Sequence, residues 1–160
     1  MTIQETTPAE MWLGALIDAT SETSTLFLEL GDLRVTRRSE CIPDLTHAGF
    51  VSLTGERSSI QVVISASNDA CRELASKFLN MDEDDPQLTQ TEIVDAFGEF
   101  ANIVAGAVKQ QVSEQRQTML LGLPLVVAGK PRLSNGQFVV SADCMMGHIP
   151  LALLIITNTE

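Results

Sequence analysis

The chain has 160 residues, 44% of them hydrophobic, which is enough for one domain, residues 1–160, with a substantial core. Its formal net charge of −11 argues against nucleic acid and anionic membrane surfaces, because few cations are available to neutralise phosphates. The longest apolar run, Ile149 to Ile156, is too short to span a bilayer, and the N-terminus lacks the features of a signal peptide. We therefore expect a soluble cytoplasmic protein with a loose tail at residues 1–6.

The first helix is predicted from a capping box. Thr7 and Glu10 have the required spacing, and Pro8 occupies the first helical position, so a helix should run to about Ala19.

Two strands are predicted after a connection at residues 21–24. Leu26, Leu28 and Leu30 alternate with other residues, as in a strand, and a second strand at Leu33 to Thr36 follows the turn at Gly31. Residues 37–46 are predicted to form a loop.

A hairpin and a second helix should come next. Phe50 to Thr54 and Ile60 to Ser65 flank the turn sequence GERSS, and Ser67 has the character of a helix N-cap. The segment MDEDDPQ, residues 81–87, then connects to the following helix. Its acidic run lacks the alternation and glycine of an EF-hand loop, which favours a solvated connection.

Three strand-like runs end the chain, with a turn at Ser134 to Gly136 before the second. They are Met119 to Ala128, Phe138 to Ala142 and Gly147 to Thr157. The order of helix, strands, helix, helix and strands predicts an α+β fold, with a largely antiparallel sheet and helices on one face.

The segment from Thr89 to Gln111 is predicted to be a mostly buried helix, with Thr89 and Glu92 as its capping box. Apolar side chains occupy a broad sector, and a narrow polar strip remains. The strip includes Gly98, Glu99, Asn102 and Gly106. Each glycine is less favourable in a helix than alanine by about 1 kcal/mol, and Gly106 leaves bare backbone that another molecule could approach.

Glu99 and Asn102 are adjacent on this strip at spacing i, i+3. Their residue types fit either a solvated helix face or a functional site. A carboxamide has a donor and an acceptor and can orient a water molecule for attack on a phosphoryl group, and a carboxylate can bind a lysine of a partner.

Other chemistries have weaker signals. His47 and His148 belong to no zinc-binding pattern, so no metal site is expected. Phosphate-binding loops and nucleophile motifs are absent from the sequence. Cys41, Cys71 and Cys144 have no paired spacing, and we expect them to be buried, unpaired thiols.

The segment GEFANIVAGAVK, from Gly98 to Lys109, resembles the signature helix of the CheC/CheX/FliY phosphatases of bacterial chemotaxis. The segments VSLTGERSSIQVVISAS and LGLPLVV resemble the family's hairpin and the strand after the signature helix. A single copy of the motif is more similar to CheX than to CheC.

This resemblance implies a CheC-like fold and hydrolysis of the aspartyl phosphate on a CheY-like response regulator. It implies that Asn102 orients the attacking water and that Glu99 pairs with the receiver's lysine, with Gly98 and Gly106 at the partner surface. No cofactor is expected on this chain, because the Mg²⁺ would belong to the receiver. CheX-type proteins are similar to one another in forming homodimers through strands. The alternative is a module that docks through the same helix without catalysis.

Overall fold

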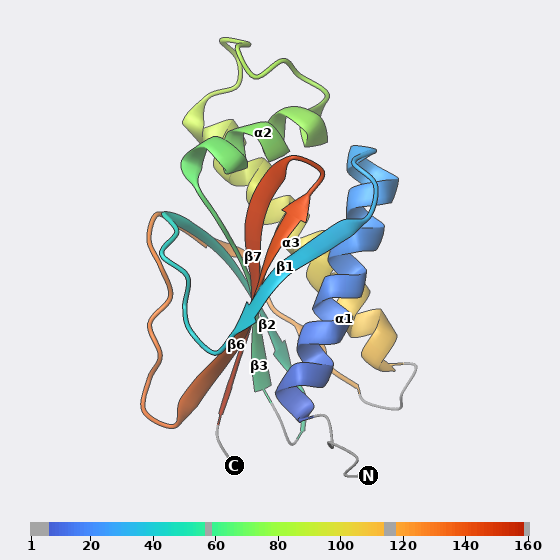
Figure 1. Cartoon of the computed structure of the whole chain (residues 1–160), viewed down its shortest axis with the longest axis vertical. Coiled ribbons are helices and arrows are strands. Elements are labelled where there is room, and N and C mark those ends of the chain that lie inside the picture. The colour runs from blue at the N-terminus through green and yellow to red at the C-terminus, as the bar shows by residue number, and fades with distance from the viewer. Residues whose placement is uncertain (1–6, 57–58, 114–117, 159–160) are drawn as a thin grey trace.

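The computed structural model describes residues 7–56, 59–113 and 118–158 (Figure 1). The predicted tail at residues 1–6 and the hairpin tip at residues 57–58 lie outside the described residues. The elements in chain order are α1 (Pro8–Thr23), η1 (Ser24–Leu28), β1 (Leu33–Ser39), β2 (His47–Thr54), β3 (Ser59–Ala66), α2 (Asn68–Leu79), α3 (Gln90–Ser113), β4 (Leu120–Leu121), β5 (Leu125–Val127), β6 (Gln137–Met146) and β7 (Ile149–Asn158).

All seven strands belong to one sheet, and every pairing is antiparallel. The order is β1-β6-β7-β3-β2, and both β4 and β5 pair with the far side of β2. The hairpin β2–β3 and the hairpin β6–β7 are joined through β3 and β7 at the centre of the sheet. The predicted α+β class with an antiparallel sheet is confirmed.

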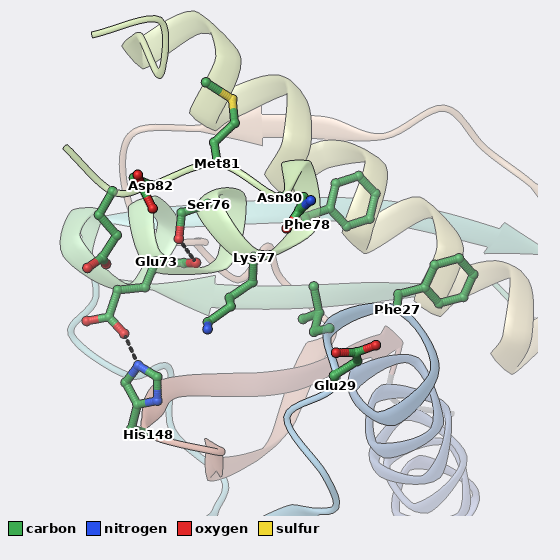
Figure 2. Close-up of a pocket in the computed structure, with 12 residues that line it drawn as sticks. Phe27, Glu29, Glu73, Ser76, Lys77, Phe78, Asn80, Met81, Asp82 and His148 are labelled. Atoms are coloured by element: carbon green, nitrogen blue, oxygen red, sulfur yellow. Dashed lines mark hydrogen bonds and ion pairs between the residues drawn. The ribbon is translucent and has the colours of Figure 1, made fainter. Parts of the chain in front are cut away.

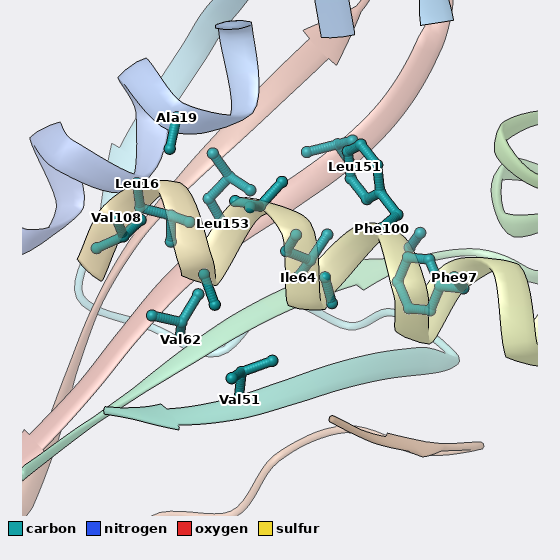
Figure 3. Packing of buried hydrophobic residues seen from close by; sticks show 14 of the residues in the cluster. Leu16, Ala19, Val51, Val62, Ile64, Phe97, Phe100, Val108, Leu151 and Leu153 are labelled. Atoms are coloured by element: carbon teal, nitrogen blue, oxygen red, sulfur yellow. The ribbon is translucent and has the colours of Figure 1, made fainter. Parts of the chain in front are cut away.

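The helices cover one face of this sheet. Helices α1 and α3 lie side by side, and the main core forms between them and the strands (Figures 1 and 3). Phe97 and Phe100 of α3 are fully buried there, as is Leu16 of α1. The opposite face of the sheet carries a smaller apolar cluster, against which Ile42 and Leu45 of the loop after β1 pack.

The start of α1 agrees with its capping prediction, but its end does not. The Thr7 hydroxyl accepts a hydrogen bond from the backbone N–H of Glu10, and the Glu10 carboxylate accepts one from the N–H of Thr7. The helix continues past Ala19 to Thr23 and then widens into the π-helical turn η1. The predicted connection at residues 21–24 is therefore wrong.

The strand predicted at Leu26 to Leu30 is also wrong. Of the three large apolar residues in η1, only Leu28 is buried, at 4% exposure, whereas Leu26 and Phe27 face outward. Glu29 takes the left-handed conformation at φ 55°, and the N–H of Leu30 bonds to the carbonyl of Ser24 at 3.2 Å. The chain continues as a helical turn that buries Leu28, whereas the alternating leucines had predicted a strand.

Further strand boundaries differ from the predictions. Residues 37–39 belong to β1 and not to the loop. The single strand predicted at residues 119–128 is two short strands, and Pro124 between them has no N–H to continue a ladder. Gly147 is a turn residue at φ 61° between β6 and β7. The predicted hairpin, the helix after Ser67 and the turn at residues 134–136 are confirmed.

Candidate functional site

Helix α3 is the element that positions the candidate site. The Thr89 hydroxyl accepts a hydrogen bond from the N–H of Glu92 at 3.3 Å, which satisfies one donor of the first turn. The buried sector of the helix contacts β2 and β3, α1 and α2. The buried large and small apolar side chains of this sector are those of Ile93, Ala96, Phe97, Phe100, Ala101, Val104, Ala105, Val108 and Val112. This packing fixes which residues of the helix face outward.

Glu99 and Asn102 lie on the outward face, as predicted. Glu99 is exposed and Asn102 is half-buried, one turn apart on the helix, where side chains at i and i+3 are neighbours. Within residues 7–56, 59–113 and 118–158, no hydrogen bond or ion pair involves either side chain. The carboxylate and the carboxamide are thus both available to an external partner.

The two glycines of the predicted strip differ. Around Gly106, which is half-buried, no atom lies within 4 Å of an added β carbon, so the backbone there is open to approach. Gly98 is buried, and its β carbon would lie 3.2 Å from Cγ2 of Val126 on β5. The prediction that Gly98 belongs to an exposed strip is therefore wrong; packing within the chain explains that glycine.

The surroundings of the pair are acidic. Asp95, four residues before Glu99 on the same helix, is also exposed, and Glu92 is exposed a turn earlier. Carboxylates at this spacing lie near one another on a helix surface and favour a cationic group on a partner. The asparagine contributes a neutral donor and acceptor beside them. The arrangement can bind a lysine and hold a water molecule, but it contains no nucleophile.

The described residues contain no group of three or more His, Cys, Asp or Glu that could hold a metal ion. His47 bonds to the hydroxyl of Thr46 through Nδ1 at 3.0 Å. His148 lies in the β6–β7 turn, and its Nε2 is 2.8 Å from Oε2 of Glu73 on α2. That contact joins residues far apart in the sequence, which their spacing could not indicate. None of the described helices is long and apolar enough to cross a membrane.

The three cysteines are free thiols, and two of them are buried as expected. Burial raises the pKa of Cys71 to about 12. Burial, with a smaller contribution from the Asp143 carboxylate, also raises the pKa of Cys144 to about 12. Cys41 is exposed, so its predicted burial is wrong. It follows a strand at the edge of the sheet, where one side of the chain faces solvent.

The fold defines the class of protein. An antiparallel sheet covered on one face by α1 and α3 is shared with a CheX from Desulfovibrio desulfuricans, at 14% identity and a TM-score of 0.76, covering 92% of this chain and 99% of that one. The CheX in a CheX–CheY–BeF₃–Mg²⁺ complex from Borrelia burgdorferi has the same TM-score at 17% identity, over 93% and 98% of the two chains. FliY from Thermotoga maritima follows at a TM-score of 0.60 and 14% identity, over 99% and 92%. The chain therefore has a CheC-like fold.

The sequence narrows this class further. The family model described as chemotaxis phosphatase CheX matches residues 47–142, more than half of the chain. The chain belongs to the CheX family of chemotaxis phosphatases. A comparison with curated protein sequences gives no significant match.

Proposed function

We propose that this protein accelerates hydrolysis of the aspartyl phosphate on a CheY-like receiver domain, with Glu99 and Asn102 as its active residues. One observation carries the proposal: both side chains face outward from α3 and have no partner within the described part of the chain. The family and the CheX–CheY complex of a protein with this fold support the substrate class.

In the proposed reaction, the Asn102 carboxamide accepts a hydrogen bond from a water molecule and directs its oxygen toward the phosphorus. The water oxygen forms a new bond to phosphorus as the bond to the aspartyl oxygen breaks in line, so the products are inorganic phosphate and a free aspartate. The water's proton passes to the phosphate product or to solvent. The chain supplies no cofactor, and a Mg²⁺ ion on the receiver would neutralise the phosphoryl oxygens.

Glu99 has a positioning role in this proposal. Its exposed carboxylate pairs with the lysine of the receiver's active site, one helical turn from Asn102. The pair holds the receiver so that the carboxamide reaches the phosphoryl group. Half-buried Gly106, with open space around it, leaves clearance for the partner's backbone further along the helix.

The test measures phosphate loss from a purified phosphorylated receiver with the wild type, Asn102→Ala and the control Asn135→Ala. Asn135 is exposed in the turn before β6 and lies on no part of α3. If water orientation supplies about a hundredfold, Asn102→Ala slows hydrolysis by that factor, equivalent to about 2.7 kcal/mol of barrier. Equal rates for wild type and Asn102→Ala would contradict the mechanism. Saturable, phosphorylation-dependent binding without any acceleration would instead identify a non-catalytic docking module.

We also propose that the protein acts in the cytoplasm as a homodimer that associates through strands. Among the described strands, β1 pairs only with β6, so its outer edge has backbone groups available for another strand. Sedimentation equilibrium measures the oligomeric state. A dimer that dissociates when proline replaces Thr36 in β1, while circular dichroism shows the chain still folded, supports this edge, and a monomer throughout contradicts it.

A further inference from the structure

The end of α1 displays two large apolar side chains in the turn η1. Leu26 is 67% exposed and Phe27 is 55% exposed, although the next residue, Leu28, is buried at 4%. A soluble surface seldom displays neighbouring large apolar groups without a use for them. The turn lies on a different element from Glu99 and Asn102, the residues of the proposed phosphatase site.

Two hollows flank this apolar pair. Phe27 borders a hollow of about 770 Å³ between η1, α2 and the β6–β7 turn, which Phe78 and Lys77 also line (Figure 2). Leu26 borders a second hollow, of about 420 Å³, beside α1 and the turn before β1. The two side chains therefore form a ridge, residues 26–27, between two depressions.

Carboxylates predominate in both hollows. The second is lined by Asp18, Glu22 and Asp32, with no basic residue among its lining residues. The acidic residues of the first outnumber its basic residues, Lys77 and His148, and His148 is already paired with a carboxylate at 2.8 Å. The acidic residues that line the first hollow are Glu29, Glu73, Asp82 and Glu83. The ridge thus lies between two regions of negative potential.

The backbone holds this ridge in place. The Ser24 hydroxyl donates a hydrogen bond to the carbonyl of Gly31 at 3.0 Å, and the N–H of Leu33 donates one to the Ser21 hydroxyl at 3.0 Å. Glu29 adopts the left-handed conformation that returns the chain toward β1. A preformed turn loses little conformational freedom when a partner binds, which favours recognition.

We infer that the ridge at Leu26 and Phe27 is a docking surface for a basic segment of another protein, one that offers an apolar recess flanked by lysines or arginines. The recess would cover the two apolar side chains, and its cations would face the carboxylates of the two hollows. Charge complementarity selects this occupant, because the same carboxylates repel an acidic segment.

The test uses two synthetic amphipathic peptides, one of leucine and lysine and one of leucine and glutamate, titrated into the ¹⁵N-labelled full chain. We expect the lysine peptide to shift amide signals of residues 18–33 and 73–83 and the glutamate peptide to shift none. In fluorescence anisotropy, the double variant Leu26→Ser, Phe27→Ser should bind the lysine peptide at least about tenfold more weakly. The charge variant Asp18→Asn, Glu22→Gln should bind it several-fold more weakly and with a smaller salt dependence.

The matched control is Leu123→Ser, which removes a leucine that is 91% exposed elsewhere and should leave the affinity unchanged. Equal affinity for wild type and the ridge double variant, with both folded by circular dichroism, would overturn the inference. So would shifts spread over other acidic surfaces such as Glu40 and Asp44. Self-association of the wild type that the ridge double variant abolishes would also overturn it, by assigning the ridge to a second copy of this chain.

Discussion

The α carbon of Gly98 lies against Val126, so close that a β carbon would stand 3.2 Å from Cγ2 of that valine. Val126 pairs with Gly49 on β2. A β carbon added to Gly49 would lie 3.3 Å from the β carbon of Ala101 on α3. One glycine on the helix and one on the strand therefore set how closely α3 approaches this edge of the sheet. The distance of the outward face of α3 from the sheet therefore depends on both contacts.

Gly106→Ala and Gly98→Ala should consequently differ in stability. Alanine is favoured over glycine in a helix by about 1 kcal/mol, and at Gly106 nothing opposes this gain. At Gly98 the new methyl group displaces Val126, which offsets the gain by about 1 kcal/mol or more. Urea unfolding should therefore show Gly106→Ala as more stable than wild type, and Gly98→Ala as equal or less stable.

A double-mutant cycle tests the assigned contact. When Val126→Ala removes the clashing methyl groups, Gly98→Ala should become stabilising, whereas Gly106→Ala should gain the same amount in either background. Additive effects of Gly98→Ala and Val126→Ala would contradict the packing explanation.

Gly106→Ala should also slow receiver dephosphorylation if open backbone there admits the partner.

Ser67 should be the residue that fixes the start of α2. Its hydroxyl accepts a hydrogen bond from the N–H of Ala70 at 3.1 Å, and its extended backbone ends β3 and begins the helix. We expect Ser67→Ala to destabilise the protein by about 1 kcal/mol and Ser67→Gly by only a few tenths. Thermal unfolding of both variants is the measurement, and a larger loss for glycine than for alanine would contradict capping.

Local signals in the sequence were sufficient to predict several elements. The capping residues Thr7 and Ser67 each make the expected hydrogen bonds, because a cap depends only on residues within one turn. The helical periodicity of α3 also identified its outward pair, Glu99 and Asn102, since burial on one side of a helix leaves a regular pattern.

Features that depend on distant contacts were not predictable in this way. Leu26, Leu28 and Leu30 alternate like the residues of a strand, but η1 follows helix α1, and of its three large apolar side chains only that of Leu28 is buried. Gly98 falls within the polar sector of the helix, and only the position of β5 shows that it is buried. The Glu73–His148 contact joins α2 to the β6–β7 turn, which no spacing in the sequence relates.

The buried thiols should make stability fall at alkaline pH. Burial raises the pKa of Cys71 and Cys144 from 9.0 to about 12, so the folded state keeps protons that the unfolded chain releases. The contribution of the two thiols to the free energy of unfolding is therefore complete below about pH 9. It is lost as pH rises toward 12, by about 1.4 kcal/mol per pH unit for each thiol. Urea unfolding between pH 8 and pH 11 measures this slope, and the sequence contains no tyrosine to titrate in the same range.

The double variant Cys71→Ala, Cys144→Ala is the control, and it should show a shallower slope over the same pH range. An unchanged slope would exclude the thiols as its origin.

Native protein at pH 8 should react with a thiol reagent at Cys41 alone, because only that side chain is exposed. Rapid labelling of Cys71 in folded protein would contradict its burial.

If the exposed Glu99 carboxylate pairs with the receiver's lysine, reversing the charge of one partner should weaken binding, and reversing both should restore it. Glu99→Lys places two cations opposite each other, so it should slow dephosphorylation of the wild-type receiver by at least about tenfold, chiefly through weaker productive docking. The receiver's lysine also belongs to the receiver's own phosphorylation site, so the reciprocal receiver variant, with that lysine changed to glutamate, is tested by binding and not by rate. The Glu99→Lys protein should bind this receiver variant more tightly than the wild-type protein does. Glu40→Lys makes the same change of charge at an exposed residue beyond β1 and should alter neither quantity. If Glu40→Lys and Glu99→Lys lower the rate equally, the effect comes from net charge and not from an ion pair at α3.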